Sequence, residues 1–158
     1  MKRFKNMIIK VNEPASPAMD ISVLRGVELG RKIGVNIILS DVVEPHETIL
    51  STYADIVSPS ELIVAQRHDQ LVELALKLQG QGLEISARVS QGKNFIETVR
   101  AAISNKGDLL IKAANSIKKS FDSNSFHIVR KCPRPVWLIK EGESDKVRKI
   151  IAAIDLSM

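Results

Sequence analysis

Short runs of apolar residues alternate along the chain with longer stretches in which apolar positions recur every three or four residues. The runs predict buried strands, and the longer spacing predicts helices that turn one face toward a core. The predicted strands are 7–12, 35–43, 83–91, 108–113 and 136–140, and the predicted helices are 17–34, 59–79, 92–106 and 122–131. Strands that alternate with helices favour right-handed crossovers, and therefore a parallel, doubly wound α/β sheet.

The first predicted helix shows how the core face is expected to form. Ser16 is a suitable N-cap for it, with Pro17 at the first helical position. The residues expected on its buried face are Met19, Val23, Gly26, Leu29, Gly30 and Ile33, and those expected on its solvent side are Asp20, Glu28, Arg31 and Lys32. Two glycines on the buried face predict that this helix lies close against a sheet, at some cost in helix propensity.

Two later segments carry local signals of the same kind. The sequence Ser58-Pro59-Ser60-Glu61 is a capping box, so Glu61 is interpreted as a capping residue rather than as a catalytic acid. Strand 83–91 alternates apolar and polar residues, which is typical of a half-buried strand near a sheet edge. The expected core face of helix 92–106 consists of Ile96, Val99 and Ile103.

The last residues repeat the first strand. Residues 150–155 match residues 7–12, with Asp155 at the position of Asn12, an offset of 155 − 12 = 143 residues that is a plausible domain length. This repeat predicts one domain over 1–141, a charged linker over 142–147, and the first strand of a second domain over 148–158. An ordinary sixth strand of the same sheet is the alternative.

Composition narrows the class of protein. Apolar residues make up 44% of the chain and aromatic residues only 4%, so the core is expected to be aliphatic, as suits buried parallel strands. The single cysteine, Cys132, excludes an internal disulfide and agrees with a reducing compartment. No stretch approaches the roughly 18 apolar residues of a membrane span, and no signal peptide is visible. We therefore expect a cytoplasmic protein with no membrane partner.

The net charge of +5 raises the question of nucleic-acid binding. The basic residues are dispersed, and no aromatic residues interleave them as a base-stacking platform requires. A solvated basic surface is therefore favoured, and no nucleic-acid partner is expected. The main groups are Lys2, Arg3 and Lys5; Lys118 and Lys119; Arg130, Lys131 and Arg134; and Lys146, Arg148 and Lys149.

The sequence shows no catalytic or metal-binding constellation. The three histidines, His46, His68 and His127, have no partners at metal-ligand spacing. His127 and Cys132 lie five residues apart at a helix end and make at most an incomplete site. Neither a metal site nor a catalytic residue is predicted.

Several local sequences together resemble the universal stress protein family. They are Gly92 at the start of the third helix, Asp108-Leu-Leu-Ile on the fourth strand, and the run from His127 to Lys140 with its Cys-Pro-Arg-Pro-Val-Trp. This last run is similar to the first domain of E-type tandem members, and the resemblance covers essentially the whole chain. It implies a five-stranded sheet of order 3-2-1-4-5, the adenine-nucleotide alpha-hydrolase-like fold, in a cytoplasmic stress-response protein.

Many members of that family bind ATP with a glycine-rich loop after the fourth strand, whose backbone N–H groups suit phosphate. The family-matched ligand positions in this chain are Asn12, Val42, Ala113, Ser116, Asp122 and Ser123. The glycines are absent, the loop is shorter, and Asn12 replaces an aspartate; only Ser123 keeps a hydroxyl suited to phosphate. A carboxylate at Asp122 repels phosphate. We therefore expect no cofactor, and ATP or AMP if any.

The function that follows is a non-enzymatic stress-response domain, the first half of a tandem pair, whose main role is structural. Its expected partner is a second universal stress protein domain, or itself in a homodimer through the last strand. The expected interface residues are Val136, Trp137, Leu138 and Ile139. The alternative is a module that binds ATP, AMP or another small ligand. A nucleotide hydrolase is least favoured, because no base or metal-binding carboxylate pair is placed for it.

Overall fold

The computed structural model describes residues 4–12, 20–45, 59–79, 82–114 and 123–140. Its strands are β1 (Asn6–Lys10), β2 (Asn36–Val43), β3 (Ile85–Gln91), β4 (Leu109–Ala114) and β5 (Val136–Lys140). Its helices are α1 (Ile21–Ile33), α2 (Pro59–Gln79), α3 (Asn94–Ser104) and α4 (Ser123–Lys131). The predicted alternation of strands and helices is confirmed. The predicted linker and terminal strand lie outside the described residues.

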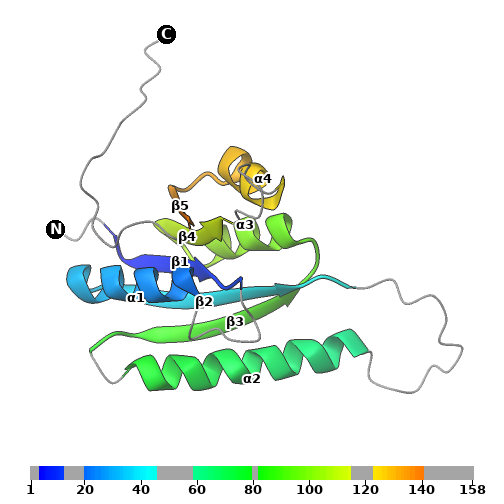
Figure 1. The fold of residues 1–158 in the computed structure, drawn as a ribbon, viewed down its shortest axis with the longest axis horizontal. Coiled ribbons are helices and arrows are strands. Elements are labelled where there is room, and N and C mark those ends of the chain that lie inside the picture. Colours follow the sequence, from blue (N-terminus) through cyan, green and yellow to red (C-terminus); the bar gives the residue numbers. More distant parts are fainter. Residues whose placement is uncertain (1–3, 13–19, 46–58, 80–81, 115–122, 141–158) are drawn as a thin grey trace, which may run out of the picture.

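The five strands form one parallel sheet in the order β3-β2-β1-β4-β5. Figure 1 shows the sheet extending from β3, beside α2, to β5, beside α4. This is the doubly wound order that the family resemblance implied. β1 occupies the middle of the sheet, and β4 is its neighbour although a long stretch of chain separates them.

Alternate residues of the central strands serve two separate cores, because successive side chains of a strand point to opposite faces. On one face, Ile9 and Ile37 belong to a cluster that includes residues of α1 and α2. On the other face, Ile8 packs with Ala102 of α3 and Ile128 of α4. The sheet is therefore covered by helices on both sides, as a buried parallel sheet requires.

The start of α1 differs from the prediction. Ser16 and Pro17 lie outside the described residues, and the helix begins at Ile21 with Asp20 as its N-cap. The expectation that Asp20 lies on the solvent side is wrong, because its side chain accepts a hydrogen bond from the Ser22 N–H and is buried. The helical wheel misplaced Asp20 because this residue is the cap rather than part of the helix.

The two glycines of α1 bring the helix close to the sheet, as predicted. A Cβ atom on Gly26 would lie 2.9 Å from Cγ1 of Ile9, and one on Gly30 would lie 2.6 Å from Cδ1 of Ile37. Both distances are shorter than ordinary van der Waals contact. A larger residue at either position would therefore have to push the Ile9 or Ile37 side chain aside or move α1 away from the sheet.

The predicted core face of α3 is wrong in part. Ile96 and Ile103 are exposed, whereas the buried residues are Thr98, Ala101 and Ala102. Small side chains allow the helix backbone to approach the sheet, and Ala102 there packs with the core. The large apolar residues Ile96 and Ile103 are consequently turned away from the sheet.

The edge position predicted for residues 83–91 is confirmed. β3 pairs only with β2 among the described strands, and its Ser86 and Arg88 are exposed. Among the helices of the described residues, none has the length and hydropathy of a membrane span.

Candidate functional site

The direction of strand order changes between β1 and β4, because β1 continues to β2 on one side while β4 continues to β5 on the other. In open α/β sheets ligands bind at the carboxyl ends of the strands at such a switch point. Asn12 follows β1 there, and Ala113 lies at the end of β4. The Asn12 side-chain Nδ2 donates a hydrogen bond of 2.8 Å to the Ala113 carbonyl oxygen. Two family-matched positions are thus brought together, and the protein's own bond joins them.

The amino end of α1 faces this point and holds a carboxylate. Asp20 is 1% exposed, and its two oxygens accept hydrogen bonds from the backbone N–H groups of Asn12 and Ser22. These are donors that an anion at a helix N-terminus would otherwise use. The negative charge at this end of α1 is therefore supplied by the chain itself. An Asp two residues before a Ser was the signal for this cap, and the sequence interpretation missed it.

A buried ion-pair network lies beside the switch point. Lys10 Nζ is 2.9 Å from Asp41 Oδ1, and both side chains are 3% exposed. Arg67 of α2 reaches the other Asp41 oxygen at 2.9 Å, and the Val42 backbone N–H donates to Asp41 at 2.7 Å. The network fastens α2 to the carboxyl ends of β1 and β2. The signal for this network in the sequence was Lys10, which follows two isoleucines on a strand predicted to be buried. A buried charge requires a partner of opposite charge.

A second buried lysine neighbours the first. Lys112 of β4 is the register partner of Lys10, and 3% of it is exposed. Its Nζ donates to the Ala113 carbonyl and lies 2.9 Å from Oγ of Ser125, in the first turn of α4. The Ala113 oxygen accepts from both Lys112 and Asn12, so its two lone pairs are engaged.

The remaining family-matched positions are less closely associated. Val42 is buried on β2, and its N–H is bound to Asp41. Ser123 is the exposed first residue of α4. Ser116 and Asp122 lie outside the described residues. Asn12 and Ala113 are thus the matched pair that the described structure places in contact.

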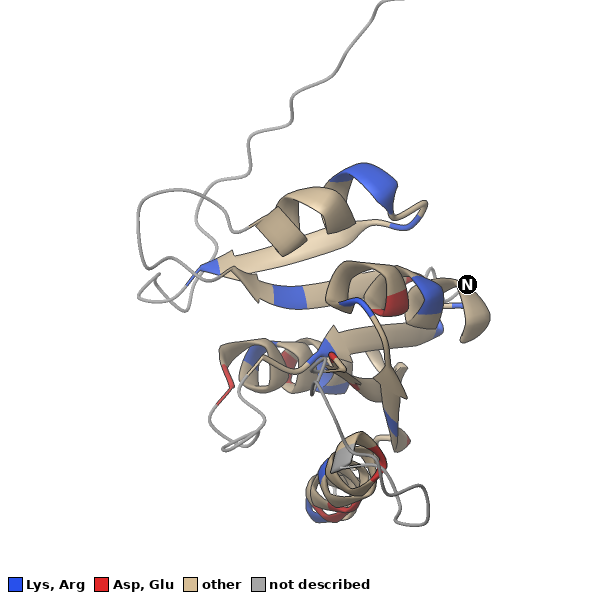
Figure 2. Ribbon diagram, turned by 90° about the vertical axis from the view of Figure 1, so that its right-hand side faces the viewer, with Lys and Arg blue, Asp and Glu red and all other residues tan. Residues whose placement is uncertain are grey.

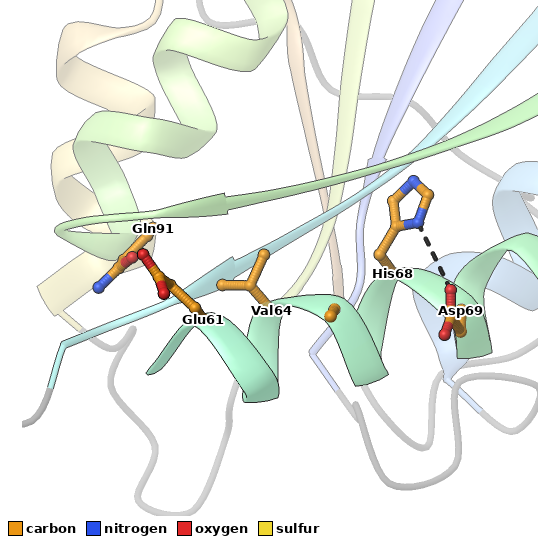
Figure 3. Close-up of a pocket in the computed structure, with 6 residues that line it drawn as sticks. Glu61, Val64, His68, Asp69 and Gln91 are labelled. Carbon is orange, nitrogen blue, oxygen red and sulfur yellow. Dashed lines mark ion pairs between the residues drawn. The ribbon is translucent and has the colours of Figure 1, made fainter. Parts of the chain in front are cut away.

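A groove of about 330 Å³ lies between the first half of α2 and the end of β3. Val64 and Ala65 give it an apolar floor, and Glu61, His68, Asp69 and Gln91 complete the lining. Figure 3 shows Glu61, Val64 and His68 on the side of α2 that faces Gln91. Glu61 therefore lines a groove. In its predicted capping role it would pair with Ser58, which lies outside the described residues. The sequence interpretation did not anticipate this groove.

The carboxyl and imidazole groups of the groove form a weak pair. His68 Nδ1 is 3.9 Å from Asp69 Oδ1, and the side chains are 48% and 87% exposed. Among the described residues, no three His, Cys, Asp or Glu side chains converge as metal ligands would. The groove has the size of a small-ligand site, near the lower limit of the usual range.

Cys132 and His127 serve α4 in different ways. His127 stacks on Phe95 of α3 with a centroid separation of 4.9 Å. Burial raises the pKa of the Cys132 thiol, and the backbone and charge of Arg134 oppose that shift only in part. The thiol is therefore protonated at neutral pH and a poor nucleophile.

The basic residues of the chain are distributed over several elements. Figure 2 shows Lys and Arg segments on helices and strands around the described domain rather than along one of them. The switch point nevertheless carries two buried lysines, Lys10 and Lys112, close to the sheet's carboxyl edge.

Comparison with curated proteins finds similarity to universal stress protein E of several bacteria. No protein-family model matches the chain. It is 25% identical over 164 residues to universal stress protein E of Escherichia coli strain K12, and 24% identical to that of Salmonella typhi. Each match covers 99% of this chain and 52% of the relative. The chain therefore spans about half the length of the curated relatives it matches.

Solved structures share the fold. Universal stress protein UspA from Lactobacillus plantarum matches with a TM-score of 0.67 at 17% identity, over 87% of this chain and 98% of that chain. The Archaeoglobus fulgidus universal stress protein in complex with dAMP matches with a TM-score of 0.56 at 17% identity, over 89% of this chain and 100% of that chain. A universal stress protein in complex with cAMP matches with a TM-score of 0.56 at 15% identity, over 87% of this chain and 97% of that chain.

Proposed function

We propose that the chain, which is similar to universal stress proteins E in sequence and to universal stress proteins in fold, is a non-enzymatic stress-response domain of that family and acts by pairing with a second domain through β5. The partner is the second half of a tandem protein, or a second copy of this chain. The relatives support this proposal, because they are about twice as long as the chain.

The observation that carries the proposal is the edge position of β5. Among the described strands, β5 pairs only with β4. Its Val136, Trp137 and Leu138 are half-buried, whereas the Ile139 side chain is buried in the core. An apolar edge with unpaired backbone groups is a template for strand addition. Ile139 is thus expected to contribute backbone rather than side chain to the interface.

The switch point supports a structural role over nucleotide binding. The Asn12 amide and the Lys112 ammonium both donate hydrogen bonds to the carbonyl oxygen of Ala113. The carboxylate of Asp20 already accepts hydrogen bonds at the amino end of α1. A phosphate group needs free backbone N–H groups at this place. The chain has instead engaged its polar groups with one another, so we infer a degenerate nucleotide site.

A small-ligand module is the second candidate function. The groove of Val64, Ala65 and Gln91 favours it, because its volume is adequate for a small ligand. Native mass spectrometry of the protein purified from its host would detect a retained ligand. The proposal also includes a role in the stress response and a location in the cytoplasm. Cell fractionation tests the location.

The proposal is tested by multi-angle light scattering on the full chain and on Trp137→Lys and Leu138→Pro variants, with circular dichroism to verify folding. We expect a dimer for the parent and a monomer for a folded variant of either kind. Leu24→Lys, at an apolar residue of α1 that is 50% exposed, is the matched control and should remain dimeric. A monomeric parent, or a dimer that persists in both β5 variants, would refute pairing through this strand.

A further inference from the structure

The groove beside α2 has two polar ends and an apolar middle. Glu61 and Gln91 lie at one end of it, as Figure 3 shows. His68 and Asp69 lie at the other end, and Val64 lies between the two. A lining of this kind suits a ligand that carries a polar group at each end and an apolar body between them.

The helix period explains why the lining forms a continuous strip. Residues at i, i+3, i+4 and i+7 share one face of a helix, and Glu61, Val64, Ala65 and His68 have this spacing. Asp69 lies beside the strip at its far end. Each residue of a helix adds about 1.5 Å along the axis, so Glu61 and Asp69 are about 12 Å apart along α2. The two carboxylates therefore stand at opposite ends of the groove.

The charge of the lining favours a cation. None of the described residues that line the groove is a lysine or an arginine, whereas Glu61 and Asp69 are acidic. Arg67, the arginine of this half of α2, is directed instead to Asp41, at 2.9 Å. A phosphate or carboxylate ligand would be repelled from both ends of the groove. A ligand with a positive group at each end would be attracted to both.

Each end also offers two acceptors to such a ligand. A primary ammonium group carries three N–H donors and no acceptor. The Glu61 carboxylate and the Gln91 amide oxygen can accept from one ammonium, and the Asp69 carboxylate and a ring nitrogen of His68 can accept from the other. The separation of 3.9 Å between His68 Nδ1 and Asp69 Oδ1 is too long for a hydrogen bond. The imidazole therefore leaves the Asp69 oxygens available to a ligand.

We propose that this groove binds a linear aliphatic polyamine, with a terminal ammonium at each carboxylate and the methylene chain against Val64 and Ala65. The inference names the ligand class of the small-ligand module, and it rests on that second candidate function. It does not depend on pairing through β5.

The length of the groove distinguishes one polyamine from another. Single bonds of about 1.5 Å at tetrahedral angles advance a saturated chain by about 1.25 Å each, so about nine or ten bonds span about 12 Å. Spermidine is a linear triamine of about this length, and putrescine is roughly half as long. Spermidine can therefore reach both carboxylates at once, whereas putrescine reaches one at a time. The groove volume of about 330 Å³ suits a slender molecule of this kind.

The apolar middle of the groove adds to the attraction of its ends. Val64 is half-buried and Ala65 is exposed, so methylene groups that cover them remove apolar surface from water. The chain as a whole carries a net charge of +5, which opposes unspecific attraction of a polycation. Binding of a polyamine would therefore report the local arrangement of the groove.

The first test is calorimetric titration of the full chain with spermidine and with putrescine at low salt. Spermidine is expected to bind about tenfold more tightly, because it forms a second ion pair and covers more of the apolar middle. Diacetylspermidine, whose terminal amines are blocked, is the matched ligand control. It should bind at least about tenfold more weakly than spermidine.

The second test uses variants whose folding is verified by circular dichroism. Glu61→Gln and Asp69→Asn should each weaken spermidine binding about threefold to fivefold, the range for loss of an exposed ion pair. Ala65→Phe fills the middle of the groove without a change of charge and should abolish binding. Glu73→Gln is the matched control, since Glu73 is an acidic residue of α2 that is 66% exposed and lies outside the groove. Its affinity for spermidine should equal that of the parent.

The outcomes separate this inference from the function on which it rests. Absence of spermidine binding to the parent overturns the inference, and so does equal binding by the parent, Glu61→Gln, Asp69→Asn and Ala65→Phe. Equal affinity for spermidine and putrescine overturns the two-ended arrangement. If native mass spectrometry finds a retained ligand without amino groups that Ala65→Phe loses, the polyamine is overturned and the small-ligand module stands.

Discussion

Lys10 and Asp41 form an ion pair of 2.9 Å between side chains that are only 3% exposed. Replacement of Asp41 by alanine would leave the Lys10 ammonium buried without its counter-charge, and it would also release Arg67. We expect Asp41→Ala to lower the free energy of unfolding by about 3 kcal/mol or more. Urea unfolding followed by circular dichroism measures the change.

The matched control for this prediction is an exposed ion pair. Glu28 lies 2.7 Å from Lys32, and their side chains are 51% and 69% exposed. Glu28→Ala should change the free energy of unfolding by less than about 1 kcal/mol. If Asp41→Ala cost no more than Glu28→Ala, the buried network would have no structural importance.

A second prediction concerns acid stability. Hydrogen bonds from the backbone N–H groups of Lys5 and Asn6, at 2.7 and 3.0 Å, lower the pKa of Asp108 below its ordinary value. The folded state thus favours the ionised carboxyl. Asp108 therefore adds stability that is fully present above its ordinary pKa of about 4, and that is lost as the pH falls through the lower pKa of the folded state.

Asp108→Asn measures that contribution. The variant should be less stable than the parent at pH 7, and the difference should shrink as the pH falls below about 4. Urea midpoints at several pH values follow it. Asp69→Asn, at a side chain that is 87% exposed, is the control and should show no comparable loss. A difference that persists unchanged into strong acid would contradict the assigned role of the two backbone N–H groups.

A third prediction is that ATP does not bind the domain. Ala113 stands where the family's loop begins with glycine, and its carbonyl is engaged by Asn12 and Lys112. Calorimetric titration with millimolar Mg-ATP should give no saturable heat. A universal stress protein with the complete glycine pattern is the positive control. A dissociation constant in the low micromolar range would disprove the degenerate site.

A fourth prediction concerns residues 144–158, which repeat the first strand in sequence. β1 already occupies the middle of the sheet between β2 and β4. The truncated chain 1–143 should therefore retain a cooperative thermal transition close to that of the full chain. Truncation after residue 133 also removes β5 and is the comparison, since it should destabilise the fold strongly. A non-cooperative transition for 1–143 would assign the terminal strand to this sheet.

The pattern of the sequence predicted the elements better than the positions of polar groups. Gly26 and Gly30 fall on the buried face of α1, where their spacing placed them. Alternation along β1 also predicts the face of Lys10, but it says nothing of where a four-carbon side chain ends. The Nζ of Lys10 reaches Asp41 on the neighbouring strand, a contact that depends on strand order. That order came from the family resemblance rather than from periodicity.

The error in α3 has a related cause. Hydropathy assigned the core to Ile96 and Ile103, but contact with the sheet is made by Ala101 and Ala102. Close approach of a helix to a sheet favours small residues, and a pattern of large apolar residues does not reveal it. The same large side chains then remain on the surface.

The two edges of the sheet differ in character, and this difference limits how large an assembly can become. β3 presents the polar Ser86 and the charged Arg88 to solvent, which discourages another strand from adding there. β5 presents Val136 and Leu138. When two apolar edges meet about a two-fold axis, only the polar edges remain at the ends of the joined sheet. With the proposed pairing, growth would therefore stop at two domains, and the sheet would not extend into a fibre.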